Sequence, residues 1–176
     1  MKLTIIISGF PGVGKTHLTS MYKDTDVIVH DSDSSQFSWL EPGVRNPDFP
    51  RNYIEHIKGL IGKADYILVS SHKDVRNMLA EENIMYALVY PTHDMYQVYM
   101  DRYKMRNSND TFIDLMSKNF HSFVDQCKDD DSAIHIEIED DSYLTDVLSY
   151  IREVYTKLIN WLETTREALS NYKKEE

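Results

Sequence analysis

Eight residues near the start of the chain have the types and spacing of a phosphate-binding loop. The octet GFPGVGKT, residues 9–16, matches the pattern G-x-x-x-x-G-K-[ST] at every position. Its glycines allow close approach of the backbone to a phosphate, and successive amide N–H groups can point at it. We expect Lys15 to reach the β- and γ-phosphates of ATP, and the Thr16 hydroxyl to bind Mg²⁺. The predicted nucleotide-binding residues are Gly9, Gly12, Val13, Gly14, Lys15, Thr16 and His17.

Two aspartates, Asp31 and Asp33, directly follow a short apolar segment that we predict to be the second strand. At the carboxyl edge of a parallel sheet, they would lie beside the phosphate site. One carboxylate, for which we choose Asp31, can hold Mg²⁺ through a bound water, and the other can accept the proton of an attacking hydroxyl. Of these two side chains we expect only one to face the chemistry. Helix capping is the alternative role.

The elements that position these residues alternate between strand-like and helix-like segments. We expect strands at 3–8, 27–30, 66–70, 85–90 and 133–138, and helices at 15–23, 51–62, 73–82, 94–105 and 111–127. The alternation predicts a single α/β domain, residues 1–176, with a five-stranded, mainly parallel sheet and helices on both faces. Residues 38–50 contain Pro42, Pro47, Pro50 and Gly43, and we expect an irregular, exposed loop there.

The net charge of −10 is concentrated in the last third, because residues 107–176 carry 7 basic and 16 acidic side chains. This acidity disfavours a polynucleotide partner, although a small anion can still bind in the nearly neutral middle of the chain. The single cysteine, Cys127, excludes an intrachain disulfide and a multi-cysteine zinc site. No apolar run approaches the roughly 20 residues of a membrane span. We therefore expect a cytoplasmic protein without a membrane partner.

Apolar residues recur at alternating spacings of four and three from position 144 to position 172, with Thr165 as the polar exception. This heptad pattern predicts a long C-terminal helix at about 143–172. Two interpretations are open. The helix packs on its own sheet and frays at the charged end, or its distal half, with Trp161, packs on a second chain in a homodimer.

The loop, the aspartates and a basic middle segment together resemble the P-loop kinases of the nucleoside monophosphate kinase type, which include adenylate and shikimate kinase-like enzymes. The sequence looks most similar to the small adenylate kinase-like enzymes encoded by bacteriophages, and the resemblance covers most of residues 1–150. It implies the three-layer sandwich of P-loop NTPases with the strand order 2-3-1-4-5. For a phage-encoded chain it also implies the host cytoplasm.

The resemblance assigns the acceptor to a segment at about 36–63, where Arg45 and Arg51 would hold an acceptor phosphate. Tyr53 could stack on a base, but aromatic residues at such positions more often belong to the core. Arg76, after the third predicted strand, is a weaker acceptor candidate, with a solvated helix face as the alternative.

The resemblance also implies a short lid at about 102–111. Arg102 and Arg106 are four residues apart and lie on one helical face, so both could neutralise charge on the transferred phosphoryl group. A basic, solvent-exposed helix face is the alternative.

Three functions are compatible with these features. The first is an ATP- and Mg²⁺-dependent kinase that phosphorylates a (deoxy)nucleoside monophosphate. The second is a kinase for a hydroxyl group on a nucleoside, a metabolite or a polynucleotide, with Asp31 or Asp33 as the base. The third is a nucleotide-binding regulatory protein with little catalysis, which the lack of an acidic pair after the third strand permits.

Overall fold

The computed structural model describes residues 2–172 and confirms the α/β architecture. Its main sheet contains β1 (Ile5–Gly9), β2 (Val29–Asp31), β5 (Tyr66–Ser70), β6 (Ala87–Pro91) and β7 (Ile134–Ile138). The strands are ordered β2-β5-β1-β6-β7, which is the order that the resemblance implied. Every pairing is parallel, so all five carboxyl ends lie at the same edge of the sheet.

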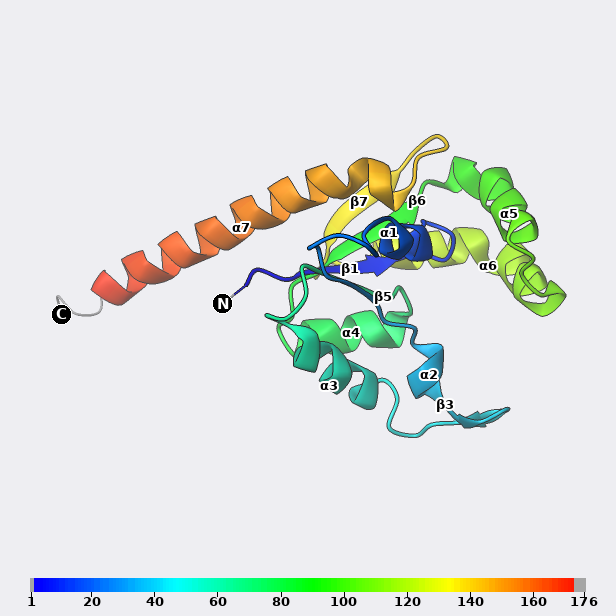
Figure 1. Ribbon diagram of the computed structural model, residues 1–176, viewed down its shortest axis with the longest axis horizontal. Helices are drawn as coiled ribbons and strands as arrows, with labels where there is room; N and C mark the ends of the chain where they lie inside the picture. The colour runs from blue at the N-terminus through cyan, green and yellow to red at the C-terminus, as the bar shows by residue number, and fades with distance from the viewer. Residues whose placement is uncertain (1, 173–176) are drawn as a thin grey trace.

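Helices cover both faces of this sheet, as Figure 1 shows. One face is covered by α1 (Lys15–Met21) and α7 (Leu144–Tyr172). The other is covered by α3 (Arg51–Leu60), α4 (Lys73–Glu81) and α6 (Asp110–Lys128). The turn η1 (His93–Met95) leads from β6 into α5 (Tyr96–Met105), which lies beside α6 near the carboxyl edge.

Residues 38–50 are more regular than we expected. After the short helix α2 (Ser35–Ser38), strands β3 (Trp39–Glu41) and β4 (Val44–Arg45) form an exposed antiparallel hairpin. Gly43 adopts a φ of +82° at its turn. The prolines lie in the turn or after β4, where no ladder hydrogen bond is needed, so they do not prevent the strand pairing.

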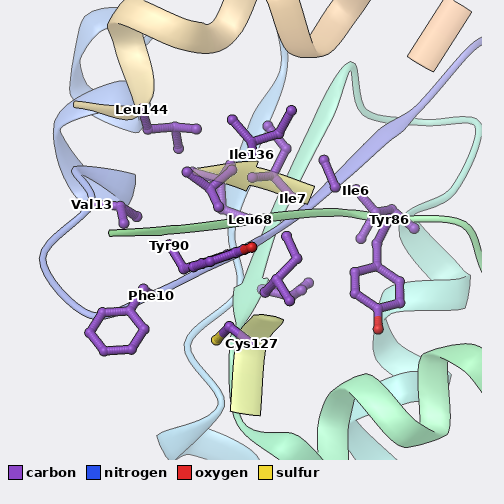
Figure 2. Packing of buried hydrophobic residues seen from close by; sticks show 14 of the residues in the cluster. Ile6, Ile7, Phe10, Val13, Leu68, Tyr86, Tyr90, Cys127, Ile136 and Leu144 are labelled. Atoms are coloured by element: carbon purple, nitrogen blue, oxygen red, sulfur yellow. The ribbon is translucent and has the colours of Figure 1, made fainter. Parts of the chain in front are cut away.

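The core is built from aliphatic side chains of the central strands and from large tyrosines. Figure 2 shows Ile6, Ile7 and Leu68 within it. Tyr53 belongs to this core and is fully buried, so it is not available to stack on a base. Its hydroxyl donates to the Ser32 carbonyl (2.5 Å) and accepts from the Ser70 amide (3.3 Å). Tyr53 therefore joins the segments that follow β2 and β5.

The C-terminal helix is buried only along its first half. Leu144, Leu148, Ile151 and Tyr155 are buried against the sheet, whereas Trp161 is 62 % exposed. The distal half extends away from the rest of the chain (Figure 1). The last heptad position, 172, has a side chain outside the described residues. None of the helices within residues 2–172 has both the length and the apolar character of a membrane span.

The sequence suggested that Arg76 binds an acceptor or lies on a solvated helix face. In the structure its side chain is buried and its guanidinium is already paired. Its side chain is 3 % exposed, and its Nη1 pairs with the carboxylate of Asp130. Nε donates to the Ser71 carbonyl (3.0 Å) and Nη2 to the Gln126 carbonyl (2.9 Å). Arg76 thus joins α4 to the end of α6, since Gln126 lies in α6 and Asp130 just after it.

The pKa of Asp130 shows that its hydrogen bonds outweigh the effect of burying its charge. Burial alone would raise this pKa, but hydrogen bonds from Ser132, Tyr86 and Arg76 outweigh burial and hold it below the usual carboxyl value. The folded state therefore gains stability from the ionised carboxylate above the unfolded-state pKa, and loses it as the pH falls through the folded-state pKa.

Arg76→Ala should lower the free energy of unfolding by about 3–5 kcal/mol at neutral pH, because it leaves the Asp130 charge buried and unpaired. Urea denaturation measures this difference, which should shrink as the pH falls through the lowered folded-state pKa of Asp130 and the carboxylate is protonated. The exposed Arg166→Ala is the matched control and should change stability by no more than about 0.5 kcal/mol. Equal stabilities of both variants would contradict the pairing.

Candidate active site

The phosphate-binding loop runs from the end of β1 to the first turn of α1. Gly12 and Gly14 adopt φ values of +90° and +102°, a region that favours glycine. A Cβ on Gly12 would lie 3.0 Å from the ring of Tyr103, and one on Gly14 would lie 3.2 Å from Tyr143. Conformation and close packing both require glycine at these two positions.

Four carbonyl oxygens of this loop are held by hydrogen bonds from side chains or a neighbouring backbone. The pairs are Lys15 Nζ to Gly9 O (2.6 Å), Tyr103 Oη to Pro11 O (2.8 Å), Arg102 Nη1 to Gly12 O (3.4 Å) and the Leu144 amide to Val13 O (2.8 Å). The donors come from α1, α5 and the start of α7. These contacts fix the orientation of the peptide units.

The amide groups of the loop are left free by the same arrangement. Within the part of the chain that the structure describes, the amides of Gly12, Gly14, Lys15, Thr16 and His17 donate no hydrogen bond. The Val13 amide differs, because it donates to the Phe10 carbonyl (3.2 Å). Free amides at the N-terminus of a helix form a site for an anion such as a phosphate.

Lys15 brings a positive charge to these amides. Burial, with a smaller contribution from the Arg106 charge, lowers the pKa of Lys15 to about 8, against the opposing effect of Asp31 and Asp33. Near pH 8 the ammonium group is therefore about half deprotonated in the free protein. A bound anion would favour its charged form.

A cavity of about 650 Å³ opens from the loop toward the end of α5. It is lined by Pro11, Gly12, Gly14, Lys15, Thr16, His17, Arg102, Met105, Arg106 and Tyr143. Five of the predicted nucleotide-binding residues therefore face it. Gly9 and Val13 do not line it, since both are buried and a Cβ on Gly9 would lie 2.9 Å from Val13 Cγ2.

The two aspartates line a second cavity, of about 260 Å³, together with Lys15 and Thr16. The expectation that only one of them faces this region is wrong. Side chains two residues apart in an extended segment lie on the same side, so Asp31 at the end of β2 and Asp33 just after it can both reach this cavity. Both carboxylates consequently lie beside Lys15.

The two carboxylates have different partners. Asp31 Oδ2 accepts a hydrogen bond from the Thr16 hydroxyl (3.1 Å). Asp33 Oδ1 accepts from the Ser35 amide (2.9 Å), and its Oδ2 accepts from the Ser35 hydroxyl (2.8 Å). Asp33 therefore forms a local turn with Ser35, the first residue of α2, and still faces the cavity. Each of its oxygens keeps a second lone pair for another donor.

Thr16 and Asp31 suit a magnesium ion that arrives with phosphates. Mg²⁺ prefers oxygen ligands and is usually bound by one or two protein groups together with waters and substrate phosphates. The hydroxyl of Thr16 and the carboxylate of Asp31 are adjacent oxygen donors of this kind. Residues 2–172 contain no group of three or more His, Cys, Asp or Glu side chains able to hold a metal by themselves.

Arg102 is buried at the wall of the 650 Å³ cavity and joins two segments of the chain. Besides its contact with the loop, its Nη2 donates to the carbonyls of Asp141 (2.9 Å) and Ser142 (3.1 Å). Its guanidinium carbon lies 3.8 Å from the ring centroid of Tyr143. Arg102 thus fastens the phosphate-binding loop to the segment before α7.

Arg106 occupies a freer position at the end of α5. It is exposed, its Nε donates to Ser108 Oγ (2.7 Å), and it lines the 650 Å³ cavity with Lys15. The segment 102–111 around it is compact, since α5 ends at Met105 and α6 begins at Asp110.

Arg45 and Arg51 are not brought to the loop. Arg45 is exposed on the hairpin, with its guanidinium carbon 5.1 Å from the ring centroid of Trp39 and 4.9 Å from that of Phe49. Arg51 is the exposed first residue of α3. Neither residue lines a cavity that contains Lys15.

Two tyrosines at the site were not among the residues predicted from the sequence. Tyr103 holds the loop through Pro11, and Tyr143 covers Gly14 and stacks on Arg102. Tyr143 lies more than a hundred residues after the loop and has no recognisable motif around it. Only the packing of α7 against the loop reveals its position.

Comparisons with known proteins identify the fold of the chain but not its family. No protein-family model matches the chain, and no curated protein matches it. The tunicamycin resistance protein of Deinococcus radiodurans has a similar structure, with a TM-score of 0.62, 14 % identity, and coverage of 88 % of this chain and 96 % of that one. A gluconokinase from Sinorhizobium meliloti gives a TM-score of 0.53, 13 % identity, and coverage of 93 % and 97 %. These likenesses confirm the fold.

Binding of ATP with Mg²⁺ near pH 8 should take up as much as about half a proton per site, because the phosphates restore the charge of Lys15. Calorimetric titration in buffers of different ionisation enthalpy measures this uptake, which should vanish near pH 6 and in Lys15→Ala. Binding at pH 8 without proton uptake would contradict the lowered pKa.

Proposed function

We propose that the chain is an ATP-dependent kinase that transfers the γ-phosphoryl group to a hydroxyl acceptor, with Mg²⁺ bound beside the nucleotide. The free amides of the loop, the Lys15 ammonium group and the Thr16 hydroxyl support the binding of ATP. The 650 Å³ cavity has room beyond the phosphates for the rest of a nucleotide, against Met105 and Tyr143.

One observation favours the hydroxyl acceptor: Asp31 and Asp33 share a cavity with Lys15 and Thr16. A base at the point of transfer is useful only when the attacking group carries a proton. A phosphate acceptor is already ionised and instead requires cations, but Arg45 and Arg51 line neither cavity that contains Lys15. The nucleoside monophosphate acceptor stays a prediction from the sequence.

The solved gluconokinase is consistent with this choice. Its name denotes a kinase for gluconate, which carries hydroxyl groups, and its fold is similar to that of this chain. The acceptor of this chain is not inferred to be gluconate, because the likeness extends to the fold alone.

In the proposed reaction the acceptor oxygen attacks the γ-phosphorus and forms a new P–O bond. The bond between the γ-phosphorus and the bridging oxygen breaks, and ADP leaves. Asp33 accepts the proton of the hydroxyl, since Asp31 and Thr16 would hold the Mg²⁺ ion. Bound Mg²⁺ would neutralise phosphate charge, held through Thr16 and Asp31. Arg106, at the cavity wall, would stabilise the charge on the transferred group.

Asp33→Asn should lower kcat by about 10²–10⁴-fold while it changes the KM for ATP little, because an amide accepts no proton at neutral pH. The assay uses labelled ATP and an acceptor panel of nucleoside monophosphates, nucleosides, sugar acids and 5′-hydroxyl oligonucleotides. Exposed Asp24→Asn is the control and should match the unmodified chain.

Three results would contradict this proposal. A loss of only a few-fold in Asp33→Asn would remove the general base. Preference for a nucleoside monophosphate, unaffected by Asp33→Asn, would restore the phosphate acceptor. Tight ATP binding without any transfer would favour a regulatory, nucleotide-binding protein.

We also propose that the distal part of α7 pairs with a second copy of the chain. The heptad spacing continues past the buried first half, and Trp161, Leu162 and Leu169 are exposed there. A pattern of apolar residues at alternating spacings of four and three is that of helices that pack on one another. The homodimer would bury these side chains without involving the sheet.

Leu162→Glu should convert a dimer to a monomer in sedimentation equilibrium, because it places a charge at an exposed heptad position of the apolar stripe. Tyr150→Glu is the matched control, since Tyr150 is an exposed aromatic residue on the same helix but outside the heptad positions. A monomeric unmodified chain would contradict the pairing, as would a dimer that persists in Leu162→Glu.

A further inference from the structure

An apolar pocket of about 350 Å³ lies against the phosphate-binding loop on the side of α6. Its apolar wall comes from Phe112, Leu115, Met116 and Phe123 of α6 and from Phe10 and Pro11 of the loop. In Figure 2, Phe10 lies on the same side of the sheet as Cys127, which also lines the pocket, and Leu144 lies on the other. The pocket is therefore separate from the face that α7 covers.

The pocket is next to the two cavities of the site. It shares Pro11 with the 650 Å³ cavity and Ser70, at the carboxyl end of β5, with the cavity of the aspartates. A molecule whose apolar part fills the pocket can thus extend past Ser70 toward Asp33. This position suits an acceptor rather than the nucleotide, whose cavity opens toward α5.

The charges around the pocket disfavour a phosphorylated occupant. The guanidinium of Arg76 lines it, but this group is neutralised by Asp130 and also donates to two carbonyls. The other polar groups are the neutral Ser70, Ser71 and Gln126, with His72 and the exposed Lys73 at one end. Apolar walls with a few polar groups are typical of sites for small organic molecules.

We propose that this pocket binds an apolar part of the acceptor, so that the substrate is an amphipathic alcohol with an aliphatic or aromatic group beside its reactive hydroxyl. This inference rests on the proposed hydroxyl kinase. It adds the substrate class, because the pocket selects for apolar surface and the aspartates select for a hydroxyl.

The test uses linear primary alcohols, namely ethanol, butanol, hexanol and octanol, with glycerol as the polar reference. Carbon-13 NMR of the Met116 methyl group, beside Leu115 in the pocket, reports binding without any need for turnover. Affinity should rise about threefold to fourfold for each added methylene group. With labelled ATP, kcat/KM for the same alcohols should rise in parallel.

Leu115→Glu places a charge in the pocket and should flatten this dependence on chain length in both measurements. Leu115 is 49 % exposed, so the substitution does not disturb a buried core. Met21→Glu is the matched control: Met21 is 51 % exposed at the end of α1, and the variant should keep the dependence.

The outcomes separate this inference from the proposed function. Phosphate transfer to alcohols with no dependence on chain length, or with glycerol preferred, would overturn the apolar acceptor and leave the hydroxyl kinase standing. Binding that increases with chain length but gives no transfer would overturn the acceptor role of the pocket. Absence of a Met116 shift with every alcohol would overturn the pocket as a binding site.

Discussion

The site depends on the orientation of the peptide units between β1 and α1. Their carbonyl oxygens accept hydrogen bonds from Lys15, Tyr103, Arg102 and the Leu144 amide, so the amides on the other side of the loop stay free. When no ligand is bound, the free amides of such a loop have only water as a hydrogen-bond partner. The loop is stable because its carbonyl oxygens are paired. The neighbouring elements have the positions that this pairing requires: α5 supplies a tyrosine and an arginine, and α7 begins where its first amide meets Val13.

The other side of the site is organised by the hydroxyl of the buried Tyr53, which holds the chain after β2 close to the chain after β5. Asp31, at the end of β2, and Asp33, just after it, line one cavity together with Ser70. Three cavities consequently meet around Lys15 and Pro11: one suited to a nucleotide, one with two carboxylates, and one with apolar walls. Their arrangement is compatible with the proposed nucleotide, base and acceptor in a single site.

Local patterns predicted the parts of this structure that depend on local interactions. The apolar runs located the five strands to within two residues, and the octet at 9–16 located the loop, since these features follow from side-chain periodicity and from glycine conformation. Local patterns did not predict the contacts that some residues make with partners far away in the sequence. Arg76 is an ordinary helical arginine by its pattern, but its partners Gln126 and Asp130 lie on α6 or just after it. Arg102 is similar, because Asp141 and Ser142 are reached only through the folding of α7 onto the loop.

Short stretches of sequence are enough to predict the phosphate-binding loop, the alternation of strands and helices, and the two acidic residues after β2, because each is encoded within a few neighbouring residues. The tertiary structure alone decided which polar groups are free to act. In the folded chain Arg102 is hydrogen-bonded to the segment before α7, and Arg76 is paired with Asp130. Arg45 and Arg51 line neither cavity that contains Lys15, whereas Asp31 and Asp33 line one of them. The physical reason is that a charged side chain is available to a ligand only when burial and hydrogen bonding have not already committed it, and those conditions depend on residues distant in the chain.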